Sequence, residues 1–150
     1  MQVRIRRADL KDLSYLVTFT AEEAREAEGS IKIPDTLEKG IRKALEDDSV
    51  ALYWVLVDDQ NSPVGSVSAI KEWSDWNAGY YWWIQSMYLS PIQRGKGRMA
   101  LLLDAVKYEM QQQQGLELRL YVHEDNRAAI RAYEKSEFVH SKYKIMTLSK

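Results

Sequence analysis

Hydrophobic residues in the first third of the chain follow strand spacing once and helix spacing twice. Apolar and charged residues alternate over about 2–6, which predicts a strand. Apolar positions then recur at intervals of three and four residues over 10–28, and Gly29 can end that helix. A second helix is predicted over 34–45. The chain therefore begins with one strand followed by two amphipathic helices.

The remainder of the chain alternates between apolar strand patterns and shorter helical ones. The predicted strands cover 50–57, 64–70, 80–89, 116–122 and 138–148, and the predicted helices cover 97–113 and 126–135. Turn residues between the first two of these strands predict a hairpin, whereas 72–79 is predicted to be an aromatic loop. Because the early strands are joined by hairpins and later ones by helices, the sheet should be mixed rather than wholly parallel.

Composition narrows the class of protein. A chain of 150 residues that is 45% hydrophobic fits one domain, spanning 1–150. The net charge of −1 argues against a protein that coats nucleic acid or an anionic membrane. The sequence has no cysteine, which excludes disulfides, thiolate zinc sites and a cysteine-bound intermediate. No apolar run approaches the ~20 residues of a membrane span, and no leader pattern opens the chain, so we expect a cytoplasmic location.

A glycine turn leads straight from the predicted strand 80–89 into a leucine-rich helix. Gly95 and Gly97 let the backbone approach a ligand closely, and the first N–H groups of a helix have no partner within it. The helix dipole adds about half a positive charge, and Arg94, Lys96 and Arg98 add whole ones. This turn is therefore a candidate phosphate site, most naturally for the pyrophosphate of a cofactor.

Three other interpretations of this turn are a dinucleotide-binding pattern, a nucleotide P-loop and a purely structural turn. Residues 95–100 fit the loose G-x-G-x-x-A dinucleotide pattern, but that fold places the pattern in its first strand–helix unit, whereas here only about 50 residues follow. The Ser or Thr of a nucleotide P-loop is absent. A plain strand-to-helix turn with solvent-facing basic residues is the remaining structural alternative.

A second motif begins at Asn126 and changes the balance. Together the two motifs resemble the GNAT superfamily of acyl-CoA N-acyltransferases, whose patterns are Q/R-x-x-G-x-G/A and, later, N-x-x-A-x-x-x-Y-x-K-x-G-F. The matching residues are Arg94 and Gly97, then Asn126, Ala129, Tyr133, Lys135 and Phe138. Met99 and Glu137 depart from the family pattern, since both positions usually carry a small residue. The aromatic segments around 72–76 and 82–86 are similar to a bacterial N-acetyltransferase branch with no settled substrate.

The resemblance implies an α+β fold, an α/β sandwich whose mixed, mostly antiparallel central sheet is flanked by about four helices. It also implies acetyl-CoA as cosubstrate, with backbone groups of the preceding strand pairing with the pantetheine arm. The residues implied in cofactor binding are Met87, Tyr88, Leu89, Arg94, Gly95, Lys96, Gly97, Arg98, Met99 and Asn126. Tyr133 matches the family's general acid, since a phenol with a pKa of about 10 stays protonated at neutral pH. The structural alternative for Tyr133 is an aromatic residue packed on the core.

The general base is open. A substrate ammonium with a pKa of about 10.4 must lose a proton, and Glu26 and Glu28 are the first candidates, either as base or as an anionic seat for the substrate. An exposed acidic helix end is an equal alternative. Glu72 and Asp75 could grip a cationic acceptor, and His123 has a suitable pKa but could simply cap a turn.

Two tryptophans on the predicted strand 80–89 should divide between the core and the site. Trp82 and Trp83 are neighbours, so their side chains point to opposite faces of the sheet. One is expected in the core, and the other could wall an acceptor cleft, where an aromatic ring can hold a cation.

These observations favour an N-acetyltransferase that transfers the acetyl group of acetyl-CoA directly to a primary amine. The acidic and aromatic candidates favour a small, cationic amine as acceptor, and no metal is expected. The alternative from another class is a non-catalytic acyl-CoA-binding sensor, which would not need Tyr133. A nucleic-acid-binding module is disfavoured by the near-neutral charge. Many relatives form pairs, so a homodimer is also open.

Overall fold

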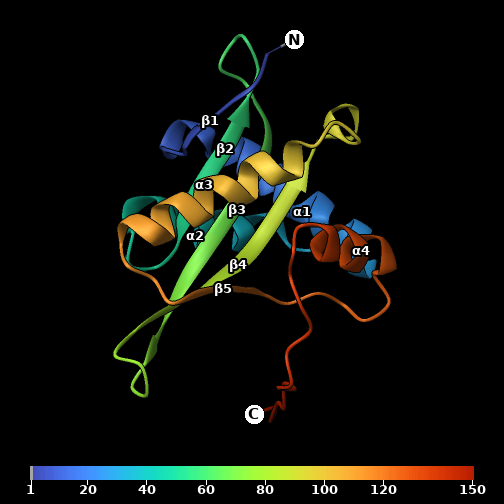
Figure 1. Cartoon of the computed structure of the whole chain (residues 1–150). Helices are drawn as coiled ribbons and strands as arrows, with labels where there is room; N and C mark the ends of the chain where they lie inside the picture. Colours follow the sequence, from blue (N-terminus) through green and yellow to red (C-terminus); the bar gives the residue numbers. More distant parts are fainter. Residues whose placement is uncertain (1) are drawn as a thin grey trace.

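The computed structural model describes residues 2–150, which build a five-stranded sheet with helices on both faces (Figure 1). The strands, in spatial order, are β1 (Arg4–Arg7), β2 (Leu52–Val57), β3 (Pro63–Ser74), β4 (Gly79–Leu89) and β5 (Glu117–Leu120). The first four strands pair antiparallel, and β4 pairs with β5 in parallel. The predicted mixed, mostly antiparallel sheet is therefore confirmed.

Residues 2–150 also form four α-helices and two short 3₁₀ turns, all but the last of which lie between strands along the chain. They are η1 (Leu10–Asp12), α1 (Leu13–Glu28), α2 (Pro34–Glu46), η2 (Pro91–Gln93), α3 (Arg98–Gln112) and α4 (Arg127–Lys135). In Figure 1, α3 crosses the near face of the sheet, α1 and α2 cover the far face, and α4 lies beyond the end of β5. This arrangement is the predicted α+β fold. None of the helices formed by residues 2–150 has the length and apolarity that a membrane crossing requires.

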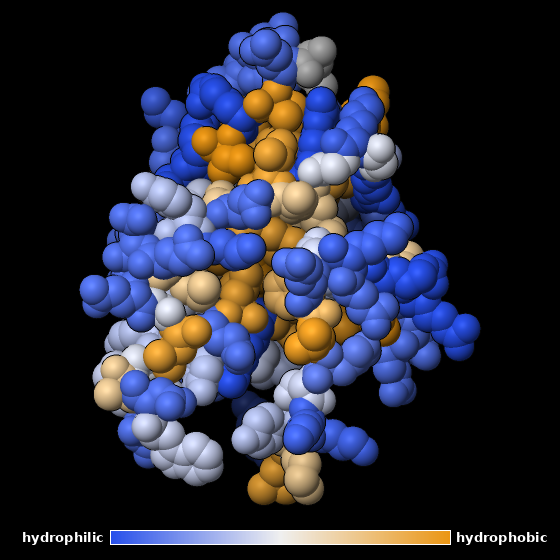
Figure 2. Space-filling view, in the orientation of Figure 1, coloured by the Kyte–Doolittle hydropathy of each residue, from blue (hydrophilic) through white to orange (hydrophobic). Residues whose placement is uncertain are grey.

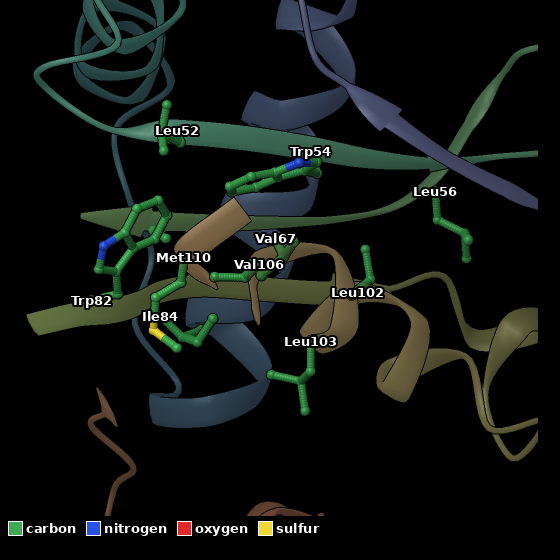
Figure 3. Packing of buried hydrophobic residues seen from close by; sticks show 11 residues of the cluster. Leu52, Trp54, Leu56, Val67, Trp82, Ile84, Leu102, Leu103, Val106 and Met110 are labelled. Carbon is green, nitrogen blue, oxygen red and sulfur yellow. The ribbon is translucent and has the colours of Figure 1, made fainter. Parts of the chain in front are cut away.

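The two faces of the sheet bury separate hydrophobic clusters. The cluster under α3 contains Trp82, Leu102 and Val106, all fully buried (Figure 3). The cluster under α1 and α2 is built around Leu16 and Val55 and is likewise closed to solvent. Both helical layers are thus fixed to the sheet by apolar burial, at roughly 25 cal/mol per Å².

The β3–β4 hairpin is longer than predicted. Residues up to Ser74 remain in β3 and only the four residues 75–78 turn, so half of the predicted loop 72–79 is strand. Cross-strand side chains explain the extension: the Trp73 and Tyr80 rings meet edge to face with centroids 5.1 Å apart, and the Lys71 ammonium lies 5.2 Å from the Tyr80 centroid.

The predicted final strand over 138–148 is wrong. Phe138 is docked, because its N–H donates to the Tyr133 carbonyl and its ring packs against the cluster under α3. The residues after it form neither helix nor strand and are exposed. A strand needs a partner edge, and this segment meets none within residues 2–150.

Candidate active site at the open edge of β4

A bulge in β4 opens the sheet beside β5. Ser68 pairs with Ser86, whereas Ala69 pairs with Ile84, so Gln85 is an extra residue without a partner in β3. The parallel pairing of β4 with β5 ends at the same point, at Ile84 and Leu120. Beyond the bulge, 86–89 keeps β3 on one side and has an open edge on the other.

Backbone alternation decides which groups face that opening. The Ser90 N–H donates to the Val64 carbonyl in β3. In an antiparallel strand successive residues turn their N–H and C=O groups to opposite sides, so Met87 and Leu89 turn theirs to the open edge. These are two of the three residues predicted to meet the pantetheine arm. The third, Tyr88, turns its backbone groups to β3, and its ring stacks on Phe19 of α1 with centroids 5.3 Å apart.

Glu23 of α1 reaches into the opening. Its Oε2 accepts a hydrogen bond of 2.8 Å from the Met87 N–H, and the Ser86 hydroxyl lies within reach of the same carboxyl group. Burial raises the pKa of Glu23 to about 7, although both hydrogen bonds act in the opposite direction, and the nearby Glu28 adds a smaller increase. A carboxyl group with this pKa exchanges protons readily at neutral pH, which is the property of a general base.

Tyr133 of α4 lies close enough to feel the Glu23 charge. Burial and, secondarily, that charge raise the pKa of Tyr133 to about 12. Its ring meets Phe138 edge to face at 5.6 Å, and within residues 2–150 its hydroxyl has no hydrogen-bond partner. Tyr133 is therefore a proton-bearing phenol within electrostatic reach of the Glu23 carboxyl group, and the two residues belong to different helices.

The glycine turn also has the geometry expected of it. Gly95 and Gly97 both adopt left-handed conformations, with φ of 74° and 72°, and a Cβ at either position would meet nothing within 4 Å. Gly97 precedes the first residue of α3, and no side chain caps the helix there. The side-chain oxygen of the buried Gln93 just before the turn lacks a partner. An open helix start with uncapped N–H groups, beside the exposed Lys96, fits a diphosphate.

Arg94 is engaged away from that helix start. Its Nη2 donates to both carboxylate oxygens of Glu26, at 2.6 and 2.9 Å, and its Nε donates to the Leu89 carbonyl. Its guanidinium also lies 5.4 Å from the Tyr88 ring centroid. Glu26, predicted as a base, is therefore an ion-pair partner that ties α1 to the turn. The pKa of Arg94 is raised mainly by this hydrogen bond.

Three further predicted residues, Glu28, Asn126 and His123, have electrostatic or helix- and turn-capping roles in the structure. Glu28 is exposed and acts on Glu23 only through its charge. The Asn126 side-chain oxygen accepts from the Ala129 N–H and so starts α4, the helix that carries Tyr133. His123 is exposed and accepts through Nδ1 from the Asp125 N–H, as a turn cap would. No group of three or more His, Asp or Glu within residues 2–150 is arranged to hold a metal.

The two departures from the family pattern have separate structural explanations. Met99 is half-buried and packs its side chain against the hydrophobic cluster under α3. Glu137 follows α4 with a φ of 73°, a left-handed conformation that glycine adopts at less cost. The family's usual glycine therefore suits the backbone at this position.

An aromatic platform flanks the site on the β5 side. Trp82 is core, as one of the tryptophan pair was expected to be, while Trp83 is half-buried and stacks on Tyr121 with ring centroids 4.4 Å apart. The Trp83 indole N–H donates to Glu72 at 3.3 Å, and the Arg119 guanidinium lies 3.5 Å from the Tyr81 ring centroid.

Sequence reasoning missed Glu23, although a signal was present. Asp12, Leu16 and Phe19 are buried at helical intervals, and Glu23 continues the same stripe at the next step of four. A carboxylate on the buried face of a helix is unusual unless it is partnered or functional. The neighbouring exposed glutamates hid this distinction.

Comparison with known proteins identifies the family of this chain. Residues 13–138 match the model of the Acetyltransferase (GNAT) family. A possible acetyltransferase from Clostridium difficile 630 has a similar structure, with a TM-score of 0.92 and 29% identity over 100% of this chain and 99% of the other. A search of curated proteins found no match.

Two further solved structures share the fold at lower identity. A predicted acetyltransferase with acetyl-CoA from Clostridium acetobutylicum gives a TM-score of 0.81 and 21% identity over 98% of this chain and 96% of the other. A ribosomal-protein-alanine N-acetyltransferase from Brucella melitensis biovar Abortus 2308 gives 0.80 and 17% over 99% of both chains. Because the family match spans most of the chain, this protein belongs to the GNAT family of acetyltransferases.

Proposed function

We propose that this protein is an acetyl-CoA-dependent N-acetyltransferase that acts directly on the primary amine of a small, cationic acceptor. The observation that carries the proposal is the Glu23 carboxyl group, which lies at the open edge of β4 with a pKa of about 7 and within electrostatic reach of Tyr133. Amine acylation needs a proton acceptor and a proton donor at one place. Acetyl-CoA would supply the acetyl group as a thioester.

Glu23 is the base in this proposal. A primary amine is almost fully protonated at pH 7, and a carboxylate with a pKa of about 7 accepts a proton more readily than an ordinary one. The Glu23 carboxylate holds the Met87 N–H until it gains that proton. Protonation weakens this hydrogen bond, so the Met87 N–H becomes free to donate to the acyl oxygen. The negative charges of Glu23 and Glu28 favour a cationic acceptor.

Tyr133 is the acid that protonates the departing thiolate. The Glu23 charge contributes to the raised pKa of Tyr133, so the phenol keeps its proton while Glu23 is ionised. Once Glu23 has taken the amine proton, this contribution disappears and the phenol gives up its own proton more easily. The shared field thus orders the two transfers, with the base acting first and the acid second.

The chain holds the cosubstrate through three groups of contacts. The N–H groups at the start of α3, beside Lys96, suit the pyrophosphate. The backbone groups of Met87 and Leu89 on the open edge suit the amides of the pantetheine arm. Asn126 is half-buried at the start of α4 and faces the arm from the opposite side in this proposal.

The test is acceptor-dependent release of coenzyme A from acetyl-CoA over a panel of diamines, polyamines, amino acid amides and neutral amines. Tyr133→Phe should lower kcat by about 10²–10³-fold and leave coenzyme A binding, measured by calorimetry, unchanged. Tyr108→Phe, at an exposed position on α3, is the matched control and should change neither kcat nor coenzyme A binding. If no amine of the panel stimulates release of coenzyme A although coenzyme A binds tightly, the non-catalytic sensor is favoured.

A further inference from the structure

The bulge in β4 leaves the Trp83 ring on the same face of the sheet as the proposed base. Four other β4 side chains around the bulge pack against the cluster under α3; they are Trp82 and Ile84 before it and Met87 and Leu89 after it. The side chains between them therefore point to the other face, where the Ser86 hydroxyl meets Glu23 of α1. Figures 1 and 2 view the molecule from the α3 side, so this face lies behind α3 in both.

Flat side chains of β4 and β5 stack on this face to make the aromatic platform. In order along the two strands, its members are Tyr81, Arg119, Trp83 and Tyr121. The Arg119 guanidinium lies 3.5 Å from the Tyr81 ring centroid and 5.7 Å from the Trp83 ring centroid. The Tyr121 ring stacks on Trp83 with an interplanar angle of 19°. Because Arg119 lies between Tyr81 and Trp83, Tyr121 covers the other side of Trp83 and is the last plane of the platform.

Tyr121 ends the platform beside the opening in the sheet. It follows Leu120, which makes the last pair of β5, with Ile84, just before the bulge. Its side chain is 61% exposed, so one ring face rests on the platform and the other is open to solvent. Ser86, whose hydroxyl meets Glu23, lies two residues beyond Ile84. Two residues of strand span about 7 Å, so the open ring face lies within the length of a small molecule of Glu23.

The charges around the platform favour a cation on that open face. The platform already holds one cation between two rings, the Arg119 guanidinium. Glu117 accepts from the Arg119 Nε at 2.7 Å, and a Glu72 oxygen lies 4.0 Å from its Nη1. Two carboxylates around one guanidinium leave a net negative charge, and they engage Arg119 within the protein. Glu23 and Glu28 add further negative charge from α1. A ligand cation is therefore attracted here, whereas a ligand carboxylate is repelled.

We propose that the acceptor is a dication, a primary amine whose far end carries a second ammonium or guanidinium group, and that the open ring face of Tyr121 binds this second cation. The inference rests on the proposed acetyl transfer, because Glu23 fixes where the reacting amine lies. A short aliphatic chain then joins the two positions. The platform holds the Tyr121 ring in place before the acceptor arrives, so binding costs little ordering of this side chain.

The second cation takes no part in the transfer itself. The reacting amine forms the amide bond, the thioester bond breaks, the amine proton passes to Glu23, and Tyr133 gives its proton to the thiolate. Tyr121 is thus a specificity-determining residue, which selects dications over monoamines of the same length.

The first test compares kcat/KM for acceptors that differ only in the far group: cadaverine, agmatine, n-pentylamine and δ-aminovalerate. The wild type should favour the two dications over n-pentylamine by about three- to thirtyfold, and δ-aminovalerate should be the poorest. Tyr121→Leu should remove this preference and leave kcat/KM for n-pentylamine within about twofold, whereas Tyr121→Phe keeps the ring and the preference. Tyr108→Leu, at a matched exposure of 62% on α3, is the control and should keep the preference. Equal use of cadaverine and n-pentylamine, or a Tyr121→Leu variant that keeps the preference, would overturn the proposal.

A binding measurement separates failure of this inference from failure of the proposed function. Calorimetry on the protein saturated with coenzyme A needs no turnover, and cadaverine should bind about three- to thirtyfold more tightly than n-pentylamine, with the difference lost in Tyr121→Leu. If this difference is found but no amine is acetylated, the cation site at Tyr121 is supported and the transfer reaction is refuted. If both amines are acetylated and bind equally, the transfer reaction stands and the dication preference is refuted.

Discussion

Two glutamates of α1, less than one helical turn apart, have opposite environments. Glu23 is half-buried, accepts from the Met87 N–H and forms no ion pair with any cation of residues 2–150, and burial raises its pKa to about 7. Glu26 is more exposed and is held by both of its oxygens on Arg94. The comparison teaches that position on the helix, not residue type, separates a proton acceptor from a structural ion-pair partner. The proposals for catalysis depend on this difference.

Removing each carboxylate in turn should produce the largest difference between the two residues, and this difference should appear in kcat. Glu23→Gln removes the proton acceptor and should lower kcat by about 10²–10⁴-fold, while Glu26→Gln should lower it less than about tenfold. Steady-state kinetics with the best amine of the panel measures both. Equal losses in the two variants would contradict the assignment of the base to Glu23.

The pH profile should sharpen the same distinction. A base with a pKa of about 7 predicts that kcat/KM rises about tenfold per pH unit below 7 and levels off above it, apart from titration of the acceptor amine itself. Tyr133, with a pKa of about 12, should produce no falling limb below about pH 10. Glu26→Gln should keep the bend near pH 7, and Glu23→Gln should lose it. A wild-type profile without this bend would exclude Glu23 as the base.

Stability should respond to the two substitutions with opposite signs. The folded-state pKa of Glu23 is raised from its ordinary value of 4.5 to about 7, so the folded protein binds protons more tightly than the unfolded chain in that range. The free energy of unfolding should therefore fall as pH rises from about 4.5 to 7. At pH 8, Glu23→Gln should be more stable than the wild type by up to roughly 3 kcal/mol.

The matched variant Glu26→Gln should change the free energy of unfolding in the opposite direction. Glu26→Gln removes a partly exposed ion pair and should destabilise by less than about 1 kcal/mol. Urea unfolding at pH 5 and pH 8 measures both effects. If Glu23→Gln is less stable than the wild type at pH 8, the carboxyl group is structural and its buried charge is not a cost to the fold.

The smallest expected effect is on coenzyme A. Glu26 places a negative charge beside the turn and occupies Arg94, so Glu26→Gln should strengthen coenzyme A binding about two- to fivefold at low salt, less at high salt. Glu23→Gln should leave the affinity within about twofold. Calorimetry at two salt concentrations measures the difference. Weaker binding in Glu26→Gln would show that the ion pair instead holds Arg94 in its binding position.

Some of the architecture could be predicted from local pattern alone. The helices, the hairpins and the glycine turn follow from spacing and turn chemistry, and the left-handed Gly29, Gly95 and Gly97 occur where a residue without a Cβ was expected. The failures lie where pairing partners decide. The β3–β4 hairpin is longer than predicted because of cross-strand aromatic contacts. The predicted final strand does not form because its segment pairs with no strand edge within residues 2–150.

The sequence by itself determined the order of elements up to α4, the glycine turn at 94–97 as a candidate phosphate site and the place of Tyr133 in a motif. Only the tertiary structure distinguished Glu23 from Glu26, because burial and partner choice depend on where α1 meets β4. The open edge of β4 likewise exists only once Gln85 bulges and β5 ends beside it. Local motifs can be recognised in the sequence. Shifted pKa values and open strand edges arise only from residues that folding brings together from distant positions in the chain.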